Sequence, residues 1–140
     1  MKLLITLMFS VLMLFAVNAK DAAFALDFED NYNIALQKAK VEKKPLMLVV
    51  VQDTCPYCSR LIENTFEDSR VKKNLDGFVS LIIDKHDNFP KQFKGTPVPM
   101  VYFIDPSIEK STYDNLGYLD AQDFSKMLKH VQSLSPKKIK

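Results

Sequence analysis

Cysteine is scarce in this 140-residue sequence: only Cys55 and Cys58 are present, separated by two residues. The loop that they would close is too small to constrain the unfolded chain much, so a small domain stabilised by a set of disulfides is excluded. Histidine is equally scarce. A structural zinc site needs about four ligands, and only His86 and His130 could join the two sulfurs, which makes a metal site a weak alternative.

An excess of charge of either sign is also missing. The chain has 19 basic and 17 acidic residues, for a formal net charge of +2. Nucleic-acid-binding domains carry a basic patch or stripe, so nothing in this balance argues for nucleic acid as a partner. The lysine-rich tail at residues 137–140 is interpreted as a solvated end. The sequence has no internal repeat or low-complexity tract, and its length suits one domain with one core.

The longest apolar run lies at the N-terminus. Lys2 precedes an almost entirely apolar run from residue 3 to 17, and residues 17–19 (Val-Asn-Ala) fit a small-residue cleavage site. This pattern is typical of a secretory signal peptide. A membrane anchor is the alternative, but the run is short for a span of about 20 residues. We therefore expect a signal peptide over residues 1–19, a mature domain over 20–140, and a periplasmic location in a bacterium.

Apolar patterning predicts an alternation of helices and strands. The run 46–51 is apolar without alternation and rich in β-branched residues, which suits a strand covered on both faces. A second such run at 78–84 follows without a hairpin turn, which indicates a βαβ unit with parallel pairing. Asp27 and Asp120 are expected to cap the first and last helices. The predicted elements are helices over 27–44, from the cysteines to 65, 69–75 and 120–134, a short helix within 89–93, and strands over 46–51, 78–84, 100–104 and 111–118, the last two antiparallel.

The two cysteines lie where the first strand gives way to a helix, in the order Cys55-Pro56-Tyr57-Cys58. A helix N-terminus presents unpaired N–H groups and a partial positive charge, which stabilise a thiolate. Pro56 suits the first helical turn, where its missing N–H costs nothing. We interpret the pair as a redox dithiol in which Cys55 is exposed and attacks, while Cys58, one turn inward, resolves the intermediate. A structural disulfide is the alternative interpretation.

A second element with chemical meaning precedes the third strand, in residues 95–100 (Gly-Thr-Pro-Val-Pro-Met). Two prolines so close together cannot be interior residues of a sheet ladder. A cis bond is predicted at Val98–Pro99, since cis peptides occur almost only before proline, typically in tight turns. The Val98 backbone groups would then be free to pair with an extended substrate chain, as in strand addition. An ordinary trans-proline loop is the alternative.

These elements together resemble the thioredoxin family: Cys-Pro-Tyr-Cys after a buried strand, a later Thr-Pro-Val-Pro, and Gly117 ahead of a final helix. The resemblance covers residues 28–134. It is strongest to small exported bacterial members, of the SoxW kind or like the C-terminal domain of the DsbD-type reductase. It implies an α/β thioredoxin-like fold with a central mixed sheet of four to five strands flanked by helices.

The resemblance also implies roles for individual residues. Cys55 would be the nucleophile, Cys58 the resolving thiol, and Pro99 the cis-proline that faces them. Tyr57 and Val98 would contact the substrate. No cofactor would be needed beyond the redox-active Cys55–Cys58 disulfide.

Some positions depart from the thioredoxin pattern. Thr54 stands where thioredoxin usually has tryptophan, and Val49 lies near the place of its buried aspartate. The proton acceptor for Cys58 is therefore not the usual one. Asp53 and Glu63 are the candidates for that role, and a surface charge is the alternative for each.

Two functions follow as hypotheses. The first is an exported thiol-disulfide oxidoreductase, acting on protein thiols and disulfides as a monomeric reductant that a membrane thiol carrier of the DsbD type keeps reduced. The second is a non-catalytic binding module with a thioredoxin fold and a structural disulfide. Glutathione binding is not supported, since the Gly-Gly element of glutaredoxins is missing and Gly117-Tyr118 stands alone.

Overall fold

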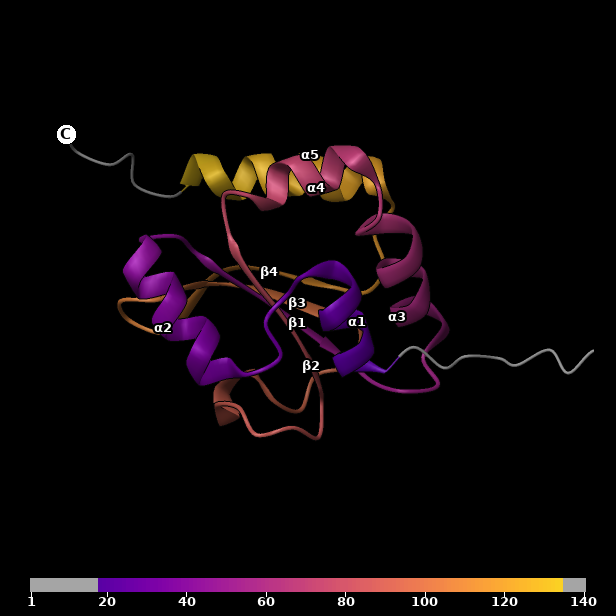
Figure 1. The fold of residues 1–140 in the computed structure, drawn as a ribbon, viewed down its shortest axis with the longest axis horizontal. Coiled ribbons are helices and arrows are strands. Elements are labelled where there is room, and N and C mark those ends of the chain that lie inside the picture. Colours follow the sequence, from indigo (N-terminus) through magenta and orange to yellow (C-terminus); the bar gives the residue numbers. More distant parts are fainter. Residues whose placement is uncertain (1–17, 135–140) are drawn as a thin grey trace, which may run out of the picture.

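A computed structural model of the chain describes residues 18–134, and the predicted signal segment lies almost wholly outside them. A four-stranded mixed sheet forms the centre, in the order β2-β1-β3-β4 (Figure 1). Four strands fall within the predicted four to five. No helix within these residues is long and apolar enough to cross a membrane. The strands are β1 (Leu46–Val51), β2 (Val79–Asp84), β3 (Met100–Asp105) and β4 (Lys110–Leu116).

Strand β1 occupies the middle of the sheet, and every one of its residues is buried. It pairs in parallel with β2, in a register that sets Leu48 against Leu81. It pairs antiparallel with β3, in a register that sets Leu48 against Tyr102, and β3 pairs antiparallel with β4. These pairings confirm the predicted βαβ unit and the antiparallel final pair. The continuous apolar run of β1 reflects burial on both faces, as in other sheets covered by helices.

Helices cover both faces of the sheet and divide the core in two. The first core contains Met47, Val49 and Val51 of β1, and most of the helices pack against it. The second core contains Leu46, Leu48 and Val50. Figure 1 shows α4 and α5 side by side over the first core, with α2 on the other side. The helices of the first core are α1 (Ala19–Leu26), α3 (Pro56–Arg60) with its π-helical continuation η1 (Leu61–Thr65), α4 (Ser69–Leu75) and α5 (Ala121–Leu134), and the second core has α2 (Tyr32–Glu42) and the 3₁₀ turn η2 (Lys91–Phe93).

The first helix was predicted wrongly as one element over residues 27–44. Within this range the structure has only α2, and Asp27 ends the preceding helix α1 in a left-handed conformation (φ 56°) instead of starting a helix. Asn31 begins α2 by accepting a hydrogen bond from the Ile34 N–H at 3.2 Å. Aspartate and asparagine are both favoured as N-caps, and both also tolerate the left-handed conformation that ends a helix. Their residue type alone therefore did not locate the boundary.

Tyr32 at the start of α2 carries a hydroxyl that is buried without a hydrogen-bond partner in the described residues. Burial raises the pKa of Tyr32 to about 12, with Glu109 adding to the effect. Tyr32→Phe removes the unpaired hydroxyl, so we expect the free energy of unfolding to rise by about 1 kcal/mol at pH 7. The folded protein keeps the Tyr32 phenol neutral, whereas the unfolded chain ionises it near pH 10. The free energy of unfolding of the wild type is therefore unaffected by this titration below pH 10 and falls as the pH rises towards 12.

The advantage of Tyr32→Phe over wild type should therefore grow between pH 10 and 12 in urea unfolding experiments. Tyr102→Phe is the matched control, because the Tyr102 hydroxyl lies 3.3 Å from Thr96 Oγ1 in the same core. That variant should lose about 1 kcal/mol. Equal destabilisation of both variants would contradict the assignment of Tyr32 as an unpaired group.

Candidate active site

The dithiol lies where β1 ends and α3 begins. The connecting turn places Thr54 in the left-handed region (φ 59°), directly before Cys55. Cys55 is the N-cap of α3 and Pro56 is in its first turn, as the sequence predicts. Cys55 and Cys58 form a disulfide with their Cα atoms 5.2 Å apart. The strand–turn–helix order thus holds both sulfurs at the N-terminus of one helix.

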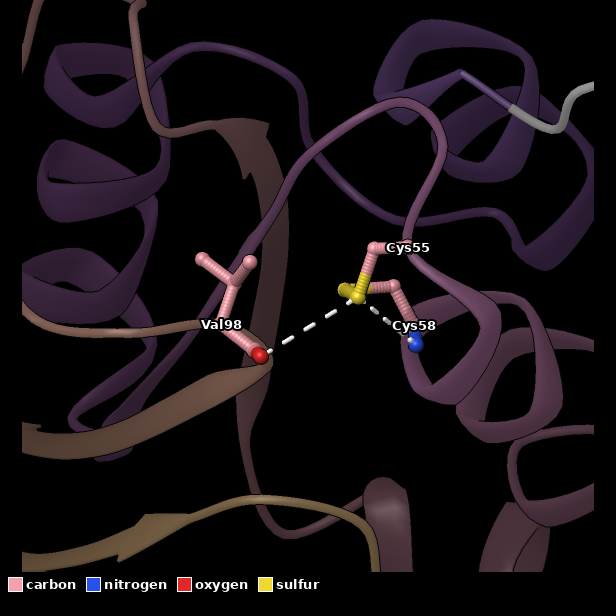
Figure 2. The surroundings of a disulfide bond; sticks show 3 residues. All are labelled: Cys55, Cys58 and Val98. Atoms are coloured by element: carbon pink, nitrogen blue, oxygen red, sulfur yellow. Dashed lines mark hydrogen bonds between the residues drawn. A yellow bond between two sulfur atoms is a disulfide. The ribbon is translucent and has the colours of Figure 1, made fainter.

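The two sulfurs have different surroundings. Cys58 is 2% exposed and belongs to the first core, whereas Cys55 is only partly buried. Cys55 Sγ accepts a hydrogen bond from the Cys58 backbone N–H at 3.2 Å. Figure 2 shows the Val98 carbonyl directed at the disulfide, with its oxygen 4.0 Å from Cys55 Sγ. Cys55 is therefore the sulfur that another protein can reach, and the N–H that points at it would stabilise its thiolate.

The loop before β3 forms the other wall of the site. The Val98–Pro99 peptide bond is cis. The Pro99 carbonyl accepts a hydrogen bond from the Gly117 N–H at 2.8 Å, which joins this loop to the end of β4. Within residues 18–134 the Val98 N–H has no hydrogen-bond acceptor. Val98 thus presents an unused donor beside the sulfurs, as strand addition by an extended peptide requires.

The remaining predicted site residues lie at the surface. Tyr57, between the cysteines, is 57% exposed. Asp53 and Glu63 are also exposed, and neither makes a hydrogen bond to Cys55 or Cys58 in the described part of the chain. Cys58 instead faces apolar side chains. The role of Asp53 or Glu63 as proton acceptor stays a prediction.

Sequence reasoning missed Arg60 and Tyr118 beside the motif. The Arg60 guanidinium lies 4.8 Å from the centre of the Tyr118 ring and 6.0 Å from that of Tyr57. The two rings are 6.3 Å apart and tilted by 31°. The i, i+3 spacing of Tyr57 and Arg60 on one helix was a usable signal. The third member, Tyr118, comes from the loop after β4, and no local pattern could have indicated it.

Thr65 fixes that loop to the active-site helix. It is fully buried at the end of η1, and its Oγ1 donates a hydrogen bond of 2.7 Å to the Leu119 carbonyl. Thr65→Val keeps the shape but leaves this carbonyl unpaired, so we expect a loss of about 1–3 kcal/mol in the free energy of unfolding by urea. Thr65→Ser is the control, since it retains the hydroxyl and should lose about 1 kcal/mol from the missing methyl. A larger loss for Ser than for Val would contradict this role of the hydrogen bond.

No group of three or more His, Cys, Asp or Glu side chains in the described residues is arranged to hold a metal ion. The chemistry that the site offers is that of its two sulfurs. The Cys55–Cys58 pair can take up or release two electrons and two protons as disulfide and dithiol.

Comparisons with known proteins agree with this geometry. The family model described as thioredoxin-like matches residues 27–106, more than half of the chain. Anterior gradient protein 2-B of Xenopus laevis is 34% identical over 85 residues, which are 59% of this chain and 51% of that protein. The thiol:disulfide interchange protein DsbD of Yersinia pestis (strain Pestoides F) is 28% identical over 102 residues, 68% of this chain and 17% of that protein. The chain thus spans about half the length of the first of these relatives.

Among solved structures, the C-terminal domain of DsbD from Neisseria meningitidis in its oxidised form is similar in fold. The TM-score is 0.58 at 18% identity, and the match covers 74% of this chain and 97% of that domain. The fold is therefore the expected α/β thioredoxin-like one. With the family match over residues 27–106, the chain belongs to the thioredoxin-like family.

Proposed function

We propose that this protein is an exported thiol-disulfide oxidoreductase that reduces disulfides in other proteins. The observation that carries the proposal is the asymmetric pair at the start of α3. Cys55 is partly exposed under the Val98 carbonyl, and Cys58 is buried behind it. A structural disulfide needs no accessible sulfur and no unused backbone donor beside it. An exchanging disulfide needs an accessible sulfur, and an unused backbone donor beside it can hold an extended substrate chain.

The reaction proceeds by two exchanges. The Cys55 thiolate attacks one sulfur of a substrate disulfide, that S–S bond breaks, and the second substrate sulfur leaves as a thiolate. The Cys58 thiolate then attacks Cys55 in the mixed disulfide and releases the first substrate sulfur. The substrate gains two electrons and two protons, and Cys55 and Cys58 become the disulfide seen in the structure. The helix N-terminus stabilises Cys55 as the attacking thiolate of the first step, and the leaving group of the second step is the substrate sulfur.

Turnover in this direction needs a dithiol that returns two electrons to Cys55–Cys58. The likeness to DsbD supports a membrane thiol carrier of that type as the donor. The proposed enzyme acts as a monomer on protein thiols and disulfides, without a cofactor and without nucleic acid. Asp53 or Glu63 would accept the Cys58 proton through solvent, since both side chains are exposed.

Export by a signal peptide over residues 1–19, with residues 20–140 as the mature periplasmic domain, belongs to the same proposal. The proposed cut lies in the first turn of α1, where Asn18 Oδ1 accepts a hydrogen bond from the Asp21 N–H at 2.9 Å. Cleavage before Lys20 would remove this cap. The intact mass of the protein from a periplasmic extract gives the position of the cut, and recovery of the uncut chain from the cytosol would contradict export.

The activity is tested by the reduction of insulin. Catalytic amounts of the folded protein should accelerate the precipitation of insulin chains by dithiothreitol, because the exchange through Cys55 is faster than the direct reaction. The direction is tested in cells by acid quenching and thiol alkylation. A reductant should be recovered mainly with Cys55 and Cys58 as thiols. Recovery as the disulfide in cells that retain the membrane carrier would contradict the reducing role.

A further inference from the structure

The surface beside the disulfide carries a cation that lies against two aromatic rings. Arg60 lies over Tyr118 at 4.8 Å and near Tyr57 at 6.0 Å. We define these three residues as the Tyr–Arg–Tyr cluster. Guanidinium stacking on aromatic faces fixes the plane of the group while leaving its N–H edges free to donate. The cluster therefore presents a preoriented fork of donors.

The cluster is tied to the sulfurs through two elements. Tyr57 lies within the dithiol motif itself. Tyr118 follows Gly117, whose N–H binds the Pro99 carbonyl at 2.8 Å, next to the Val98 carbonyl that faces Cys55. Thr65 also holds the Tyr118 loop, through its hydrogen bond to the Leu119 carbonyl. A peptide laid along Val98 with its cysteine at Cys55 would thus have its flanking residues on the same surface as Arg60.

Arg60 has no acidic partner within residues 18–134. The other arginine of the chain, Arg70, is paired with Asp68, with Nη2 2.8 Å from Oδ2. Five lysines in the described residues are also paired with glutamate or aspartate within 4 Å. The exposed acids on either side of the motif, Asp53 and Glu63, make no ion pair with Arg60. The Arg60 guanidinium can therefore pair with an acidic group of another molecule.

We propose that Arg60, oriented by Tyr57 and Tyr118, is a specificity determinant that selects substrate segments with an acidic residue close to the reacting cysteine. A substrate carboxylate can accept two parallel hydrogen bonds from the planar guanidinium, which a substrate amide or lysine side chain cannot do. A basic segment would instead be repelled. This inference rests on the proposed exchange function and names the chemistry of its substrates.

The experiment uses three symmetrical disulfides of short cysteine peptides that differ only in the flanking residues, which are glutamate, glutamine or lysine. Reduced protein is mixed with each peptide, quenched with acid and alkylated, and the rate constant for oxidation of Cys55–Cys58 is measured. We expect the acidic peptide to react about five-fold faster than the neutral one, with the basic peptide slowest. Added salt should reduce this ratio, because the pairs are exposed.

Variants locate the effect. Arg60→Gln should bring the acidic-to-neutral ratio close to one, and Arg60→Lys should leave an intermediate ratio because charge remains without the planar fork. Tyr118→Leu should lower the ratio, whereas Tyr118→Phe should retain it, since only the ring orients the guanidinium. Arg70→Gln on α4 is the matched control, with the same change of charge away from the site and an unchanged ratio.

The outcomes separate this inference from the proposed function. A wild-type ratio of one, or an Arg60→Gln variant that slows all three peptides by the same factor, would overturn the specificity role while leaving the exchange function standing. A faster reaction with the basic peptide would overturn it as well. If no peptide oxidises the reduced protein, the proposed function fails, and the inference fails with it.

Discussion

Replacing Cys55 by serine should abolish disulfide exchange, with a fall of at least about 10³-fold in the rate of catalysed insulin reduction. A serine hydroxyl is not ionised at neutral pH and forms no bond with sulfur that could pass to Cys58. The buried Cys58 cannot substitute, because it is 2% exposed and faces the core. The residual rate should equal that of dithiothreitol alone.

Cys58→Ser is the informative partner of this variant. Cys55 keeps its place at the N-cap and still attacks, but the mixed disulfide has no resolving thiol. Covalent complexes should accumulate with protein disulfides and should disappear on treatment with excess dithiothreitol. The double variant Cys55→Ser/Cys58→Ser is the control and should form none. Complexes that form equally well through Cys58 in Cys55→Ser would contradict the assignment of the nucleophile.

The second large effect concerns the packing under the active-site helix. Phe66 directly follows η1 and is fully buried, with its ring centre 5.4 Å from that of Phe28 and 5.2 Å from that of Phe124. Phe66→Ala removes a ring that joins three segments and leaves a cavity between them. We expect a loss of about 3–5 kcal/mol in the free energy of unfolding, measured by urea denaturation.

Phe24 provides the matched control for this substitution. It lies on α1 and is 90% exposed, so Phe24→Ala changes the same residue type without opening the core. The expected change is within about 0.5 kcal/mol. A loss below about 1 kcal/mol for Phe66→Ala would mean that the site is not supported by the packing described here.

The strands and the dithiol could be predicted because their signals are local. The run 46–51 is apolar throughout, and burial on both faces of a central strand demands that pattern. The motif helix begins at Pro56, which suits only a first turn. Asp120 was expected to cap the last helix, and its side chain accepts a hydrogen bond from the Asp123 N–H at 2.9 Å.

The parts that escaped prediction depend on contacts or on ambiguous residues. Helix α1 overlaps the end of the predicted signal segment. Asp27, which caps the C-terminus of α1, is a residue type that also suits the N-cap of a following helix. The five residues of the π-helical turn η1 are of types that also occur in an α-helix, so the sequence did not distinguish the two. The contact of Arg60 with Tyr118 joins segments far apart in the sequence, so only the fold reveals it.

The reduction potential of the Cys55–Cys58 pair tests the central claim most directly. The protein is equilibrated in redox buffers of graded potential, quenched and alkylated, and the fraction of dithiol is read from the mass. An exchanging disulfide at a helix N-terminus should titrate as one two-electron couple between about −120 and −270 mV, the range of thioredoxin-family oxidoreductases. A potential below about −300 mV is typical of a structural disulfide, and that result would contradict the account.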